Sequence, residues 1–210
     1  SEEDDVDASI DGIKKIVGRS FTEGETFEFK VTASAQGLNG QQIDTVPMPS
    51  NAQDGSYTLT IDDSAAADQA TLDFGSMVFT QAGIYTYTIT EVQGSASAMT
   101  YSKASYTVTM TVTDNGDGTL EVTRTIVQTA DDAGGQDNVV QSPESAVFTN
   151  TYGLNPAQFE LQGTKNMEGR NFQDGDSFTF HVSADDGSPL PSKVDGSGNV
   201  TIRPTEDTSA

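Results

Sequence analysis

The chain has 210 residues, a formal net charge of −22 and a sequence pI of about 4.1, with no cysteine and a single histidine. This charge disfavours binding to nucleic-acid phosphates or to anionic lipid, and no apolar run approaches the roughly 18 residues of a membrane-spanning helix. The missing cysteines exclude disulfides, thiolate catalysis and cysteine-based zinc sites. At roughly 150 residues per domain, the length corresponds to one domain and part of another.

Alternation of apolar and polar residues, which is typical of half-buried β-strands, dominates the sequence. DNGDG at 114–118 lies between two strong runs and predicts a hairpin loop, whereas only DDSAAADQA at 62–70 has the composition of a short helix. The pattern predicts an all-β, immunoglobulin-like antiparallel β-sandwich with one solvent-facing side per sheet. In chain order the alternating runs are 27–33, 57–61, 85–89, 106–112, 120–122 and a last run that begins at Phe148.

The chain also contains an internal repeat. Residues 12–33 (GIKKIVGRSFTEGETFEFKVTA) and 163–184 (GTKNMEGRNFQDGDSFTFHVSA) are identical at 10 of 22 positions, with an offset of 151 residues. We therefore expect a tandem repeat with a partial second copy, which on a short proline-stiffened linker is typical of an extended rod. The expected segments are an acidic N-terminal tail (1–8), a complete β-sandwich (9–152), a linker (153–156) and the N-terminal part of a second, incomplete copy (157–210).

Three polar residues of the first copy share the parity of apolar neighbours: Lys14, Glu91 and Asn150. Burial lowers the pKa of a lysine and raises that of a glutamate, so Lys14 would become a neutral, nucleophilic amine and Glu91 a protonated acid that donates to an amide oxygen. If Asn150 is their neighbour, attack of the amine on its carboxamide, with loss of ammonia, would give an isopeptide bond. The alternative is a buried Lys14–Glu91 ion pair, or strand ends that let both groups reach water.

Three segments in order, KKIVGR (14–19), YTYTITE (85–91) and FTNTY (148–152), resemble the streptococcal pilin isopeptide-linkage domain, the CnaB-like, immunoglobulin-type fold of Gram-positive pilins and surface adhesins. The resemblance implies a bond from Lys14 to Asn150, with Glu91 as the catalyst that shuttles protons. Lys15 competes with Lys14, but Lys14 precedes Arg19 by five residues, as Lys165 precedes Arg170. Lys165 therefore resembles the isopeptide lysine of the second copy.

The resemblance implies a structural stalk module of a Gram-positive adhesin or pilus, extracellular and anchored to the cell wall, whose partners are neighbouring repeats of the same polypeptide. The alternative is an adhesin module that binds a host protein or glycan through its loops. No cofactor, metal or nucleic acid is expected, and enzymatic action on an external substrate is disfavoured because no second catalytic constellation occurs. DNGDGTLE at 114–121 faintly resembles a calcium loop but fits a hairpin turn better.

Overall fold

The computed structural model describes residues 5–153, 161–185 and 190–206 and divides the chain into two compact units, Ser1–Asn155 (unit one) and Pro156–Ala210 (unit two). All regular structure in these described ranges is β-strand, which confirms the all-β prediction. None of the described segments forms a helix that could span a membrane. Of the expected linker only Gly153 is described, and residues 1–4 of the expected tail lie outside the described residues.

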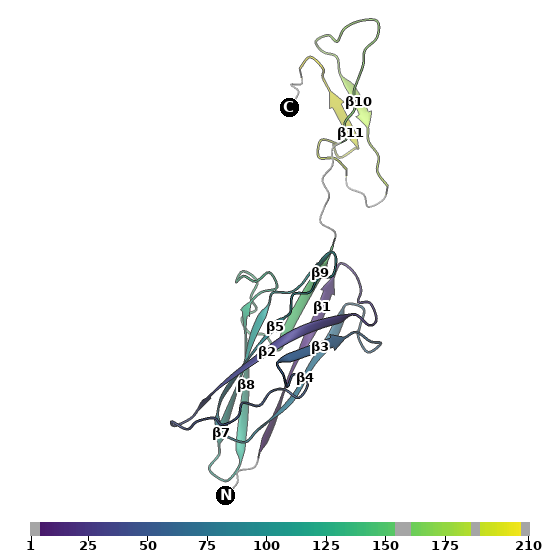
Figure 1. Cartoon of the computed structure of the whole chain (residues 1–210). Coiled ribbons are helices and arrows are strands. Elements are labelled where there is room, and N and C mark those ends of the chain that lie inside the picture. The colour runs from purple at the N-terminus through teal and green to yellow at the C-terminus, as the bar shows by residue number, and fades with distance from the viewer. Residues whose placement is uncertain (1–4, 154–160, 186–189, 207–210) are drawn as a thin grey trace. The chain divides into compact units, whose positions relative to one another are not determined.

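Unit one contains two sheets (Figure 1). The four-stranded sheet has the order β4-β1-β9-β6, and the five-stranded sheet has the order β3-β2-β5-β7-β8. The strand bounds are β1 (Val6–Val17), β2 (Thr26–Gly37), β3 (Ser56–Thr60), β4 (Gln69–Phe79), β5 (Gly83–Glu91), β6 (Met99–Thr100), β7 (Ser105–Asp114), β8 (Leu120–Ala130) and β9 (Ala146–Tyr152).

The first and last strands of unit one pair in parallel, with Gly12 opposite Ala146 and Ile16 opposite Asn150. Every other strand pair that the structure describes is antiparallel. The prediction of a wholly antiparallel sandwich is therefore wrong at this pair. A hairpin would force opposite directions, but β1 and β9 are joined through the rest of the unit and are free to run the same way.

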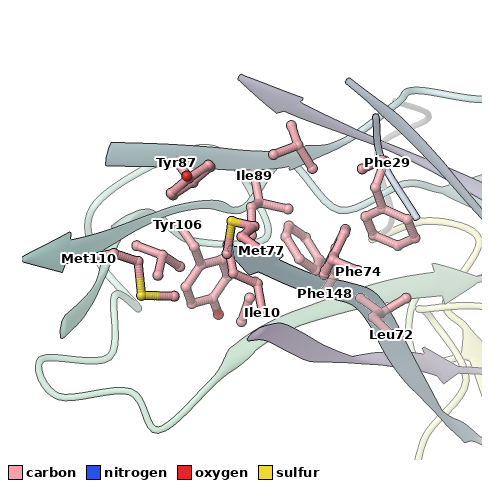
Figure 2. Close-up of a cluster of buried hydrophobic side chains, with 14 of the residues drawn as sticks. Ile10, Phe29, Leu72, Phe74, Met77, Tyr87, Ile89, Tyr106, Met110 and Phe148 are labelled. Carbon is pink, nitrogen blue, oxygen red and sulfur yellow. The ribbon is translucent and has the colours of Figure 1, made fainter. Parts of the chain in front are cut away.

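The core lies between the two sheets and contains side chains from both of them (Figure 2). Alternation follows the predicted parity, since Tyr85, Tyr87 and Ile89 of β5 are at most 1% exposed while the threonines between them are partly exposed. The buried tyrosine hydroxyl of Tyr87 donates to the carbonyl of Pro47, at 2.7 Å. Among the described residues no buried side-chain nitrogen or oxygen lacks a hydrogen-bond partner.

The structure corrects two local expectations. The segment 62–68 is irregular rather than helical, because the carboxylate of Asp62 accepts the backbone N–H of Ser64 at 2.9 Å, and this Asx turn competes with a helix. The next residues form β4, a strand that is not among the predicted alternating runs. The expected tail is shorter than eight residues, because β1 begins at Val6, which pairs with Phe79.

The predicted hairpin at 114–118 is confirmed, because β7 ends at Asp114 and β8 begins at Leu120. The N–H of Asn115 donates to the carbonyl of Thr119, at 3.0 Å. The side chain of Asp117 accepts both the N–H and the hydroxyl of Thr119, at 3.0 and 2.6 Å. This carboxylate oxygen, Oδ1 in both cases, therefore stabilises the turn itself.

Unit two has two described strands, β10 (Phe178–His181) and β11 (Asn199–Ile202), which pair antiparallel. Its larger apolar side chains are poorly covered, since Leu161 is 64% exposed, Phe180 42% and Leu190 43%. A pair of strands buries too little apolar surface to form a core of its own.

Candidate functional site

The three polar side chains singled out by parity meet in the core of unit one. Lys14 lies on β1, Asn150 lies on the neighbouring strand β9, and Glu91 ends β5 in the opposite sheet. Lys14 and Asn150 are fully buried, and Glu91 is 5% exposed. The lysine is opposite Phe148 in the β1–β9 register, so Lys14 and Asn150 are two residues out of register and project toward the same face.

Glu91 contacts both of the other groups through hydrogen bonds. Its Oε2 accepts from Lys14 Nζ at 3.3 Å, and its Oε1 lies at the same distance from that nitrogen. Oε1 also accepts from Asn150 Nδ2 at 3.0 Å. Lys14 Nζ donates further to the backbone carbonyl of Phe148, at 3.2 Å. One carboxylate therefore bridges the amine and the amide nitrogen.

The surroundings of Lys14 are aromatic. Its Nζ lies 5.0 Å from the ring centroid of Phe27, and Phe148 packs edge-on against Phe29 and Tyr106, with ring centroids 5.1 and 5.3 Å apart. Figure 2 shows these last three rings among the buried side chains. The neighbouring Lys15 is partly exposed on the other face of β1. Of the two competing lysines, only Lys14 faces the core.

Burial shifts the protonation of both charged groups in this core. Removal of Lys14 from water lowers the pKa of its amine from 10.5 to about 8, and the attraction of Glu91 only partly opposes this. Removal from water raises the pKa of Glu91, against the opposing effects of Lys14 and of the hydrogen bond from Asn150. Both shifts favour a neutral Lys14 amine and a protonated Glu91 carboxyl group over the ion pair.

The amide oxygen of Asn150 does not face Glu91, contrary to the expectation that a protonated glutamate would donate to it. Its Oδ1 accepts from the backbone N–H of Ser102 at 2.8 Å, and the same N–H lies 3.2 Å from Glu91 Oε2. Ser102 is 1% exposed, and its hydroxyl donates to Asp132 Oδ1 at 2.5 Å. Neither Ser102 nor Asp132 is among the residues predicted from the sequence, although Ser102 shares the parity of the buried Ala104, which is the kind of signal that indicates Lys14.

Lys165 lies in unit two and is partly buried, with its Nζ 4.8 Å from the ring centroid of Phe178. The structure therefore brings together three of the four predicted site residues and places the fourth in a separate unit. The combination of a buried amine, a carboxamide and a bridging carboxylate is able to support acyl transfer from the amide to the amine.

Comparison with known proteins identifies the class to which this chain belongs. The matching family is FctA, described as the Spy0128-like isopeptide containing domain, and the match covers residues 10–153. The chain belongs to this family. This confirms the resemblance to pilin isopeptide-linkage domains that the three sequence segments indicate.

Among solved structures, the major pilin of Streptococcus pyogenes is 19% identical to this chain, with a TM-score of 0.42, and the match covers 69% of this chain and 50% of the pilin. The S. pyogenes major pilin T3.2 is 19% identical with a TM-score of 0.42, covering 72% and 53%, and T-13 is 17% identical with a TM-score of 0.41, covering 70% and 53%. This chain thus spans about half the length of the solved pilins it matches. No curated protein matches it.

Proposed function

We propose that unit one is a structural module of a Gram-positive pilus or surface-adhesin stalk, stabilised by a self-generated isopeptide bond between Lys14 and Asn150. One observation carries the proposal: a single buried carboxylate, Glu91, lies within 3.3 Å of the lysine amine and 3.0 Å of the asparagine amide nitrogen. Membership of a family of isopeptide-containing domains supports the same reaction. An ordinary buried ion pair would not require the carboxamide at this position.

The reaction follows from the positions of these atoms. The neutral amine of Lys14 attacks Cγ of Asn150, and a new C–N bond forms while the carbonyl electron pair moves to Oδ1. The pair then returns, the Cγ–Nδ2 bond breaks and ammonia leaves. One proton passes from Nζ through Glu91 to Nδ2, and both nitrogens already lie beside the same carboxylate. The product is an amide that links two strands, and no other reagent is consumed.

The bond would join the first strand of the unit to the last. Lys14 and Asn150 are 136 residues apart in sequence (150 − 14), yet they lie on adjacent parallel strands. Chain-entropy models give a stabilisation of about 4–5 kcal/mol for a cross-link that closes a loop on the order of 100 residues. Tension applied beyond the two strands would be carried by the covalent link and not by the sandwich between them, which is suited to an extracellular stalk.

We further propose that residues 157–210 are the N-terminal part of a second copy, whose neighbour in the polypeptide is unit one and whose isopeptide lysine is Lys165. Local geometry supports this: Arg19 donates to both carboxylate oxygens of Glu25 at 3.0 and 2.9 Å, and Arg170, 151 residues later, donates to both oxygens of Asp176 at 2.8 and 2.9 Å. The aromatic pairs at the two sites also correspond, since Phe21–Phe27 and Phe172–Phe178 have centroids 5.7 and 6.0 Å apart.

Intact-protein mass spectrometry tests the main proposal directly. The folded chain is expected to be lighter than its sequence mass by one ammonia, and peptide mapping should locate the cross-link between the peptides that contain Lys14 and Asn150. The matched control is Glu91→Gln, which keeps the side-chain volume but removes the proton carrier and should retain the full mass. A wild-type chain at its full sequence mass would overturn the proposal.

A further inference from the structure

We propose that the backbone N–H of Ser102 stabilises the oxyanion that develops on Asn150 during bond formation, and that Asp132 is a positioning residue that holds this N–H in place. The inference rests on the proposed function of Lys14 and Asn150 and assigns roles to two residues outside the predicted triad. Ser102 lies in the short segment between β6 and β7, and Asp132 lies in the loop that connects β8 to β9.

The N–H of Ser102 points at the atom that becomes negative. Its nitrogen is 2.8 Å from Asn150 Oδ1, inside the range of about 2.7–3.1 Å that is typical of oxyanion-hole donors. Glu91 Oε2 shares this N–H at the longer distance of 3.2 Å, and the two oxygens of Glu91 also accept from Lys14 Nζ and Asn150 Nδ2. The carboxylate of Glu91 therefore moves protons between the two nitrogens, and the backbone N–H of Ser102 stabilises the oxygen of Asn150.

Asp132 links the segment that contains Ser102 to β9, the strand that carries the Asn150 carboxamide. One oxygen, Oδ1, accepts both the hydroxyl of Ser102 at 2.5 Å and the backbone N–H of Thr149 at 3.0 Å. Thr149 immediately precedes Asn150 on β9. The backbone carbonyl of Asp132 also accepts the N–H of Lys103, at 2.8 Å. Asp132 therefore bonds both to the segment that carries the Ser102 N–H and to the strand that carries Asn150.

The loop that carries Asp132 is itself fixed. The adjacent Asp131 is 4% exposed, and its carboxylate accepts the backbone N–H groups of Ala133, Gly135 and Asn138 at 2.9–3.0 Å. The hydroxyl of Ser102 also accepts the N–H of Ala104, at 3.1 Å. A preorganised donor needs little rearrangement as charge develops, which is the condition under which such donors accelerate acyl transfer most.

The role of Asp132 in positioning Ser102 through hydrogen bonds can be distinguished from the effect of its negative charge on Lys14. Asp132 helps to keep Lys14 protonated through its negative charge, so an influence exerted only through charge predicts faster bond formation when that charge is removed. A positioning role predicts slower bond formation in Asp132→Ala, because this variant loses the hydrogen bonds to Ser102 and Thr149. Asp132→Asn separates the two effects, because its amide oxygen still accepts from Ser102 and Thr149 while the charge is gone.

The experiment uses the full chain isolated unfolded from inclusion bodies, with refolding by dilution and the loss of ammonia followed by mass spectrometry. We expect Asp132→Ala and Ser102→Ala to slow bond formation at least about tenfold, somewhat less than the roughly hundredfold or more that loss of an oxyanion donor costs. Asp132→Asn should react at the wild-type rate or faster. Asp137→Ala, an exposed change in the same loop, is the control and should leave the rate unchanged.

Two results would overturn the inference without touching the proposed function: wild-type rates in both alanine variants, or equal slowing in Asp132→Asn and Asp132→Ala. A wild-type chain that keeps its ammonia would instead remove the proposed function itself. A second measurement needs no variant of Asp132 or Ser102. In isotope-labelled wild-type protein, a scalar coupling across the hydrogen bond should connect the Ser102 amide nitrogen to Asn150 Cγ, and its absence would also refute the role of Ser102.

Discussion

Lys14 and Lys165 occupy equivalent positions in the repeat but different environments. Each amine lies over a phenylalanine ring, at 5.0 Å for Phe27 and 4.8 Å for Phe178. Lys14 is fully buried and is bonded to Glu91 and to the backbone of β9, whereas Lys165 is only partly buried. The repeated segment therefore specifies the contact of the lysine amine with a phenylalanine of the same segment. The groups that would make it reactive come from β5 and β9, more than seventy residues away in sequence.

Removing each lysine in turn should give the largest difference between the two units. Lys14→Met should restore the full sequence mass and lower the unfolding free energy of unit one by about 4 kcal/mol or more, because the cross-link is lost and Glu91 remains buried without its cation. Lys165→Met should leave the mass deficit of one ammonia unchanged. Intact mass and urea unfolding measure both effects. Continued loss of ammonia in Lys14→Met would assign the bond to another amine.

The lowered pKa of Lys14 predicts a pH dependence specific to unit one, best seen without the cross-link in Asn150→Ala. The folded amine has a pKa of about 8 and the unfolded amine one of 10.5, so between these values the unfolded chain binds more protons. Stability should therefore rise from pH about 8 to about 9, by at most about 1.4 kcal/mol, since one bound proton contributes 1.36 kcal/mol per pH unit. Above this window the buried tyrosines, whose pKa values burial raises, reverse the trend.

Urea unfolding at a series of pH values measures this rise. Adding Lys14→Met to Asn150→Ala should make the curve flat over the same window, whereas adding Lys165→Met should leave the rise in place. A rise that persists without the Lys14 amine would mean that another group titrates.

A glycine pair compares the two units at the backbone. Gly18 and Gly169 both have positive φ, 98° and 87°. A Cβ on Gly18 would lie 1.9 Å from the carbonyl oxygen of Tyr152, whereas one on Gly169 would meet nothing within 4 Å. Gly18→Ala should lower the unfolding free energy of unit one by at least about 2 kcal/mol, more than the roughly 1 kcal/mol of an unfavourable φ alone. Gly169→Ala should leave the thermal or urea unfolding of unit one unchanged, because unit two has no core of its own. A loss of only about 1 kcal/mol in Gly18→Ala would show that the contact with β9 relaxes freely.

Much of unit one follows from the sequence, because a period of two reports which residues face the core. Parity placed Lys14, Glu91 and Asn150 inside, and the structure brings them together. Parity carries no information on strand direction, so the parallel pairing of β1 with β9 was missed. It also fails where side chains compete for the backbone, as at Asp62, and it does not reveal a backbone donor such as the N–H of Ser102.

The smallest predicted effect concerns the arginine–carboxylate pair that both units share. Arg19 and Glu25 form a two-pronged contact on the surface, with side chains 26% and 19% exposed. Water still reaches both partly exposed side chains and competes for the ions, so Glu25→Gln should lower the unfolding free energy by only about 0.5–1 kcal/mol and leave the ammonia loss intact. Asp176→Asn is the matched change in unit two. If Glu25→Gln instead blocks bond formation, the shared local motif contributes to the reaction in unit one, and the contrast between the two lysines would no longer rest on β5 and β9 alone.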